Sequence, residues 1–160
     1  MPVQITCTRD VVVDTNVFLH SINPDDDHHH SAFSIIHWLA MGDFQLVLDD
    51  TGKSKPNPST SRLYAEYDEL IPAETFPRIV LEALLATGRV AFVERPARAL
   101  AKEIEKKLVS NKPDRAVAGA ACMSQDRTLI TNDWDDFTED VRKWLHKKNQ
   151  VTCHDSNECV

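Results

Sequence analysis

The chain has 160 residues, of which 42% are hydrophobic and 27% charged, which is the size and composition of one globular domain with its own core. Its 25 acidic and 18 basic residues give a net charge of −7, which disfavours a passive nucleic-acid binder, because such proteins present a basic face. No stretch approaches the roughly 20 apolar residues of a membrane span, and the N-terminal MPVQITCTRD has no apolar signal core, so a cytoplasmic protein without membrane association is expected.

Strand and helix patterns alternate along the chain. The first strand is buried and β-branched, and it breaks at Asp14. Pro113 opens a helix rich in small residues, and Gly42 and Gly88 end two other helices. In chain order, the patterns predict a strand at 11–13, a helix at 30–42, a strand at 44–50, helices at 62–71 and 76–88, a strand at 89–95, helices at 97–108 and 112–123, a strand at 128–133 and a helix at 136–148.

Strands that are separated by helices are typical of a parallel sheet with helices on both faces, so α/β is the expected fold class. In such a sheet the functional site lies outside the carboxyl ends of the strands. Asp14 follows the first strand and Asp133 follows the last, so both carboxylates are predicted to converge on one cleft. A charge beside an apolar strand is costly unless something pairs with it, which favours a site over a simple strand end at Asp14.

Three further acidic residues are distinguished by their positions. Glu66 lies in YAEY on the predicted helix, Asp114 lies at the start of the small-residue helix, and Asp136 lies between the last strand and the last helix. Carboxylates from different elements can surround hard cations such as Mg²⁺ or Mn²⁺, and such ions activate water and stabilise the leaving oxygen in phosphodiester cleavage. Each position also has a structural explanation, because Asp114 suits a helix N-terminus and either Asp133 or Asp136 can cap a helix.

In their order and spacing, these motifs resemble those of the PIN-domain family, over about residues 10–152. The family opens with a hydrophobic strand that carries Asp-Thr-Asn, matched here by VDTN at 13–16. It continues with a helical Glu, matched by Glu66, and with an acidic residue that heads a small-residue helix, matched by Asp114 in PDRAVAGAA. It closes with Thr, then Asn or Asp, then Asp-Phe, matched within TNDWDDF at 131–137.

The resemblance implies a three-layer α/β/α sandwich around a mainly parallel sheet, and a Mg²⁺- or Mn²⁺-dependent nuclease that most often hydrolyses single-stranded RNA. Many small bacterial members are toxins of toxin–antitoxin pairs, inhibited by an antitoxin protein, and they are often homodimers. Carried over, the catalytic metal ligands are Asp14, Glu66, Asp114 and either Asp136 or Asp133. Asp136 matches the family's Asp-Phe, whereas Asp133 has the better strand-end position, and one ligand and one cap are expected. Asn16 and Thr131 would orient the carboxylates.

Three other functions are weighed against this one. A phosphatase of the haloacid-dehalogenase type also begins with a hydrophobic strand and Asp. Its motif requires a second Asp two residues later, and that position is occupied by Asn16 here. Glu66 and Asp114 would have no role in such a phosphatase. A PIN fold that serves as a non-catalytic partner-binding module and a nuclease that acts on DNA stay open as alternatives.

A long polar loop precedes the Glu66 helix. Lys53 and Lys55 lie within its GKSKPNPSTS segment, and Arg62 follows it, which makes this the basic cluster nearest to a proposed ligand. The cluster is interpreted in two ways: as a flap that grips substrate phosphates, or as a flexible surface loop.

Two segments that are rich in metal-binding residue types are not interpreted as metal sites. DDDHHH at 25–30 is expected to be a solvated helix start, because three successive histidines on a helix cannot point one way. Cys153 to Cys159 fits no zinc spacing, and a single domain over 1–160 with a mobile tail at 153–160 is expected. The cysteines are expected to be free thiols, with Cys122 in the core.

Overall fold

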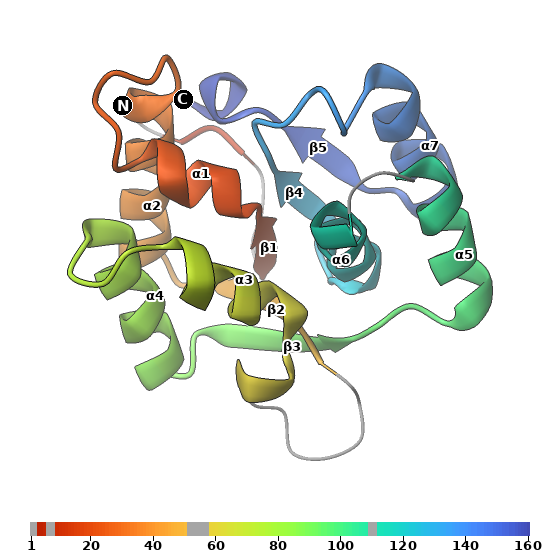
Figure 1. Ribbon diagram of the computed structural model, residues 1–160, viewed down its shortest axis with the longest axis horizontal. Coiled ribbons are helices and arrows are strands. Elements are labelled where there is room, and N and C mark those ends of the chain that lie inside the picture. Colours follow the sequence, from red (N-terminus) through yellow and green to blue (C-terminus); the bar gives the residue numbers. More distant parts are fainter. Residues whose placement is uncertain (1–2, 6–8, 51–57, 109–111) are drawn as a thin grey trace.

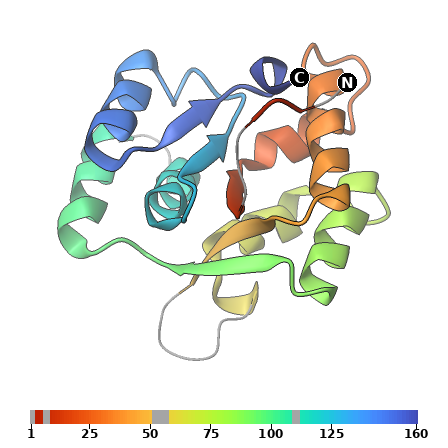
Figure 2. The same cartoon turned by 180° about the vertical axis from the view of Figure 1, so that it is seen from behind.

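Figure 1 shows a computed structural model of the protein, which describes residues 3–5, 9–50, 58–108 and 112–160. Within these ranges five strands form one sheet, in which every pair of neighbours is parallel and the order is β3-β2-β1-β4-β5. Helices flank the sheet in a three-layer α/β/α arrangement, which confirms the predicted fold class (Figures 1 and 2). The strands are β1 (Asp10–Val13), β2 (Gln45–Asp50), β3 (Val90–Glu94), β4 (Thr128–Ile130) and β5 (Thr152–His154).

The helices connect the strands and pack on them and on one another. Helix α6 packs against β1, β2, β3 and β4, α2 packs against α1 and α4, and α7 packs against β5. No helix within the described ranges is long and apolar enough to cross a membrane. The α-helices are α1 (Thr15–His20), α2 (His29–Met41), α3 (Arg62–Leu70), α4 (Phe76–Ala86), α5 (Arg98–Lys107), α6 (Lys112–Met123) and α7 (Glu139–Asn149), and two 3₁₀ helices are η1 (Pro58–Thr60) and η2 (Ser156–Cys159).

The core lies around β1 and α6. Strand β1 is buried along its whole length, because helices cover both faces of a parallel sheet. Helix α6 can lie close to the sheet because its inner residues are small: Ala118 and Ala121 are fully buried. A Cβ atom at Gly119 would lie 3.2 Å from the Pro96 ring, so glycine permits a close approach there. Cys122 is buried as a free thiol, as predicted, whereas Cys7 lies outside the described residues.

The C-terminal segment differs from the mobile tail expected at 153–160. Strand β5 pairs with β4 in the register Leu129 to Cys153, and it forms an edge of the sheet. Asp155 then caps η2 in a capping box with Glu158, and Cys159 is 1% exposed. The segment is ordered because sheet pairing and capping satisfy its backbone, although its sequence lacks a long apolar run.

Two features near the N-terminus were not predicted. The chain turns directly from β1 into the short helix α1, which keeps Val17 and Phe18 fully buried. On α2, Ile35, Ile36 and Leu39 are fully buried, whereas the aromatic Phe33 is 41% exposed.

Candidate metal centre

The strand order brings two distant segments together at the edge of the sheet that is formed by the carboxyl ends of the strands. Strands β1 and β4 are neighbours, with Val13 opposite Ile130, and the Asp14 amide donates to the Ile130 carbonyl oxygen at 2.9 Å. The chain leaves β1 in one direction, toward β2, and β4 lies on its other side, so this is the topological switch point of the sheet. In open α/β sheets, that point is where ligands bind.

Asp14 lies at this edge, and it is only 4% exposed. Its Oδ2 accepts hydrogen bonds from Thr131 Oγ1 at 2.8 Å and from Asn16 Nδ2 at 2.9 Å. Burial raises the pKa of Asp14 to about 6; the Thr131 bond opposes the shift, and the nearby charges of Glu66 and Asp133 add to it. The two residues expected to orient this carboxylate therefore both contact it.

Asp114, Asp133 and Asp136 form a second group at the same edge. One carboxylate oxygen from each of these residues lies within 4.8 Å of the others. Asp114 is 4% exposed, and burial raises its pKa to about 8, with the charge of Asp14, a hydrogen bond with Asp136 and the charge of Asp133 adding to the shift. Three carboxyl groups held this close are costly to ionise together unless a cation offsets their charge.

The roles of metal ligand and helix cap are not divided between Asp133 and Asp136 as expected. The Asp133 carboxylate does take a turn-capping bond, because Asp136 N donates to its Oδ1 at 3.0 Å. Yet both residues belong to the carboxylate group with Asp114. The prediction that one of them caps the last helix is wrong: α7 begins three residues after Asp136, and its cap is Thr138, whose Oγ1 accepts from Val141 N at 3.3 Å.

Glu66 is the candidate ligand that α3 contributes. Its side chain is half-buried, and its charge contributes to the raised pKa of Asp14. The next residue, Tyr67, is fully buried and donates its hydroxyl to the carbonyl oxygen of Val13, directly before Asp14. Sequence reasoning missed this anchor, because the partner of the Tyr67 hydroxyl lies on a strand that is distant in the chain.

The donor set fits a hard divalent cation. Five carboxylates from four segments lie at this edge, and carboxylate oxygens are the ligands that Mg²⁺ and Mn²⁺ prefer. A divalent cation would offset the unfavourable free energy of carboxylates that are ionised, buried and close to one another. The five are Asp14, Glu66, Asp114, Asp133 and Asp136.

The predicted basic cluster is described in part. Lys53 and Lys55 lie outside the described residues. Arg62 begins α3, is exposed, and lines a cavity of about 600 Å³ together with Glu66 and Lys112. One cation of the predicted cluster therefore shares a cavity with a candidate ligand.

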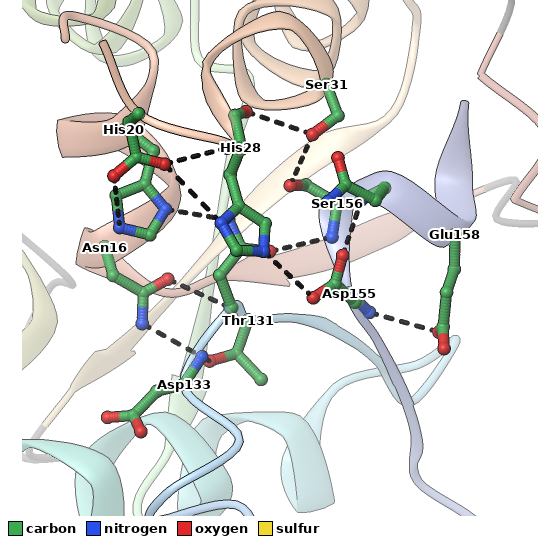
Figure 3. A network of polar contacts seen from close by, with 12 residues as sticks. Asn16, His20, His28, Ser31, Thr131, Asp133, Asp155, Ser156 and Glu158 are labelled. Atoms are coloured by element: carbon green, nitrogen blue, oxygen red, sulfur yellow. Dashed lines mark hydrogen bonds and ion pairs between the residues drawn. The ribbon is translucent and has the colours of Figure 1, made fainter.

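A network of histidines and carboxylates lies next to the site (Figure 3). Asp26 lies 3.8 Å from His20 Nε2 and 3.5 Å from His28 Nδ1, and His28 Nε2 lies 3.3 Å from Asp155. Residues 25–30 were expected to be a solvated helix start, but Asp26 and His28 are half-buried and connect α1 to the C-terminal segment. Sequence spacing could not reveal this, because Asp155 is more than a hundred residues away.

This network is satisfied by its own hydrogen bonds. Asn132 Oδ1 accepts from Ser156 N at 2.8 Å, so the Asn132 amide nitrogen faces His20 Nδ1 at 3.0 Å. A neutral His20 then carries its proton on Nε2, the atom that a cation beside Asp26 would need. Asn132 N also donates to Asn16 Oδ1 at 3.1 Å, so the network helps to hold the Asn16 side chain in place.

Comparisons with known proteins give a limited result. No family model matches the chain, and no curated protein matches its sequence. Among solved structures, it is similar to a crystal structure of VapBC2 from Rickettsia felis bound to a DNA fragment from their promoter, with 15% identity and a TM-score of 0.46 over 91% of this chain and 98% of that one. So distant a similarity carries nothing about the site.

Proposed function

We propose that this protein is a Mg²⁺- or Mn²⁺-dependent endoribonuclease that hydrolyses RNA phosphodiester bonds. The observation that carries the proposal is the group of three carboxylates, Asp114, Asp133 and Asp136, whose oxygens lie within 4.8 Å of one another beside the buried Asp14. A group of this kind is unfavourable by itself and becomes favourable around a divalent cation. The order of the sequence motifs, which resembles the PIN-domain pattern, supports the same class.

In this proposal Asp14, Glu66 and Asp114 hold the cation, together with Asp136 or Asp133. Asp14 is held in place by Thr131 and Asn16, which both donate to its Oδ2. Such bonds fix the orientation of a ligand carboxylate.

When bound, the cation supplies a water of lowered pKa and stabilises the negative charge that develops on the phosphate and on the leaving oxygen. The protein's own groups orient the reaction. The carboxylates would bind and orient the cation, and Arg62 and Lys112 line the adjoining cavity, where phosphates of the RNA would bind. No side-chain nucleophile is required.

The biological setting proposed from the motif resemblance is that of a toxin in a toxin–antitoxin pair. Its substrate would be single-stranded RNA, its inhibitor an antitoxin protein that covers the carboxylates, and its assembly a homodimer. A basic antitoxin segment that reaches into the site would pair with the same carboxylates that hold the cation.

The test is cleavage of labelled single-stranded RNA and DNA in Mn²⁺, Mg²⁺ or EDTA, with wild type compared with Asp114→Asn. Asp43→Asn is the matched control, because Asp43 is exposed in the turn between α2 and β2. We expect RNA cleavage that requires the metal, is lost in Asp114→Asn by at least about 100-fold, and is unchanged in the control.

Other outcomes would separate the alternatives. Cleavage of DNA alone keeps the site and changes the substrate. Cleavage that persists in excess EDTA contradicts the mechanism. Absence of cleavage together with absence of Mn²⁺ binding favours a non-catalytic partner-binding module.

A further inference from the structure

A second cavity adjoins the 600 Å³ cavity that Glu66 lines. It has a volume of about 330 Å³, and it lies between α5 and α6 beside Asp49 of β2. It meets the 600 Å³ cavity at Arg62, Arg115 and Ala116, which line both. Because Glu66 lines the larger cavity, an RNA strand cut at the carboxylates has this smaller cavity next to its path.

Much of the wall of the smaller cavity is apolar. Gly119 lies against Pro96, and an added Cβ would come within 3.2 Å of that ring, so the wall is closely packed there. Apolar walls suit a planar base, whereas a phosphate gains nothing from them. The apolar lining residues are Pro96, Ala101, Ile104, Ala116, Gly119 and Ala120.

Arg95 provides a fixed hydrogen-bond donor at one side of the cavity. Its Nε donates to Asp49 Oδ2 at 2.9 Å, and its Nη2 donates to the Thr60 carbonyl oxygen at 2.8 Å. Asp49 is 2% exposed, so this ion pair holds the guanidinium rigidly. The two bonds use two of the five N–H groups of arginine, which can present others to a ligand acceptor.

Arg115 and Glu105 also line the cavity. Arg115 Nε donates to the Leu108 carbonyl oxygen at 2.7 Å, and its Nη1 lies 3.5 Å from Glu105. The Glu105 side chain is 61% exposed at the rim, where a carboxylate can accept from a ligand N–H. The cavity therefore offers donors on two arginines and an acceptor on one glutamate.

We propose that this cavity binds the base of the nucleotide beside the cleaved bond, and that this base is guanine. Guanine presents two acceptors, O6 and N7, that match an arginine, and N–H donors on its other edge that match a carboxylate. Adenine places an amino donor where guanine has O6, and it would face the guanidinium with a donor. The inference rests on the proposed function, because the larger cavity leads to this one from the carboxylate site.

The experiment has a binding arm and a cleavage arm. The binding arm titrates guanosine, adenosine, cytidine and uridine 5′-monophosphates against wild type, Ala101→Trp and Ala99→Trp by isothermal titration calorimetry. Ala101 and Ala99 are both exposed on α5, but Ala101 lines the cavity, so the first substitution blocks it and the second is its control. The cleavage arm sequences the ends produced from randomised single-stranded RNA in Mn²⁺.

We expect guanosine monophosphate to bind wild type and Ala99→Trp at least about 5-fold more tightly than the other three nucleotides, with guanine enriched to a similar degree beside the cut. Ala101→Trp should lose both preferences and keep its Mn²⁺ affinity. Equal binding of the four nucleotides that is weakened alike by Arg95→Lys would identify a phosphate subsite and overturn the inference. A base preference that survives in Ala101→Trp would also overturn it.

The two proposals fail in different ways. Metal-dependent RNA cleavage without any base preference keeps the nuclease and removes the guanine pocket. Selective guanosine monophosphate binding without any cleavage keeps the pocket and removes the nuclease.

Discussion

Two buried aspartates at the ends of neighbouring strands have opposite surroundings. Asp49, on β2, is 2% exposed, and Asp14, after β1, is 4% exposed. Asp49 Oδ1 accepts from Ser61 Oγ and Leu63 N, both at 2.9 Å, and its Oδ2 accepts from Arg95 Nε at 2.9 Å. Asp14 instead faces the charges of Glu66 and Asp133, and burial together with these charges raises its pKa to about 6.

This comparison shows that burial alone does not identify a functional carboxylate. Asp49 is satisfied within the fold, since it joins the start of α3 to Arg95. Asp14 has polar neighbours on Oδ2 but carboxylates nearby, so the fold positions it without neutralising it. A buried carboxylate that the protein leaves uncompensated is the one that indicates a cation site.

The same substitution should therefore have opposite effects at the two positions. Asp49→Asn places an amide against donors from Ser61, Leu63 and Arg95, and we expect it to lower the free energy of unfolding by about 3–5 kcal/mol. Asp14→Asn can keep its oxygen toward Thr131 and Asn16, and it removes a charge that faces other carboxylates. In EDTA, it should therefore leave stability unchanged or raise it.

Urea unfolding of both variants, followed by circular dichroism, measures this difference. The Asp43→Asn protein serves as the control for a surface amide. If Asp14→Asn lost as much stability as Asp49→Asn in EDTA, Asp14 would be a structural group and the comparison would fail.

The second prediction concerns the bond that orients Asp14. Thr131 Oγ1 donates to Asp14 Oδ2, and it accepts from Asp133 N at 3.1 Å. Thr131→Val removes this link while keeping the shape of the side chain, and we expect Mn²⁺ affinity to fall by about 10- to 100-fold. Thr128→Val is the matched control, because Thr128 is also buried on β4, where its hydroxyl bonds to the Asp126 carbonyl oxygen. Calorimetric Mn²⁺ titration should show the loss for Thr131→Val alone.

The sequence was sufficient to predict the elements that bear the carboxylates. The positions of Asp14 after a strand and of Asp114 in the first turn of a helix could be predicted, because a buried strand and a small-residue helix are local patterns. The α/β class followed from the alternation of helix and strand. These features depend on hydrophobic periodicity and on turn residues, which a single sequence carries.

The sequence could not reveal contacts made between distant segments. Asp49 looked like an ordinary charge at the end of a strand, because its partners Ser61 and Arg95 come from other elements. Strand β5 is short and polar, and its pairing with β4 is a contact between distant segments. The role of Tyr67 could not be predicted, because its hydrogen-bond partner, the Val13 carbonyl oxygen, belongs to another element.

The third prediction concerns pH in the absence of metal. The folded-state pKa of Asp114, about 8, lies above its ordinary value of 3.8, so the folded chain holds this proton more tightly than the unfolded chain does. That stabilisation is fully present below the unfolded pKa and is lost as pH rises through about 8. In EDTA we therefore expect stability to fall between about pH 5 and pH 9, and Asp114→Asn to remove most of that fall.

At the upper end of this range, Asp114→Asn should unfold at least about 2–4 °C higher than wild type, which corresponds to about 1 kcal/mol. Thermal unfolding in EDTA measures the difference, and saturating Mn²⁺ should reverse it, because the cation binds only the folded wild type. A wild-type stability that rises with pH over this range would contradict the raised pKa.

The smallest expected effect is at Tyr67, which links the two regions compared above. Its hydroxyl donates to the Val13 carbonyl oxygen, next to Asp14, from the helix whose first turn is bound by Asp49. Tyr67→Phe removes one buried hydrogen bond, and we expect a loss of about 0.5–1.5 kcal/mol in the free energy of unfolding. Since Glu66 precedes Tyr67, Mn²⁺ affinity should also fall, by less than for Thr131→Val. If α3 were held by Asp49 alone, the phenylalanine variant would keep its Mn²⁺ affinity, and placement of Glu66 would then depend on Asp49 rather than on the strand that carries Asp14.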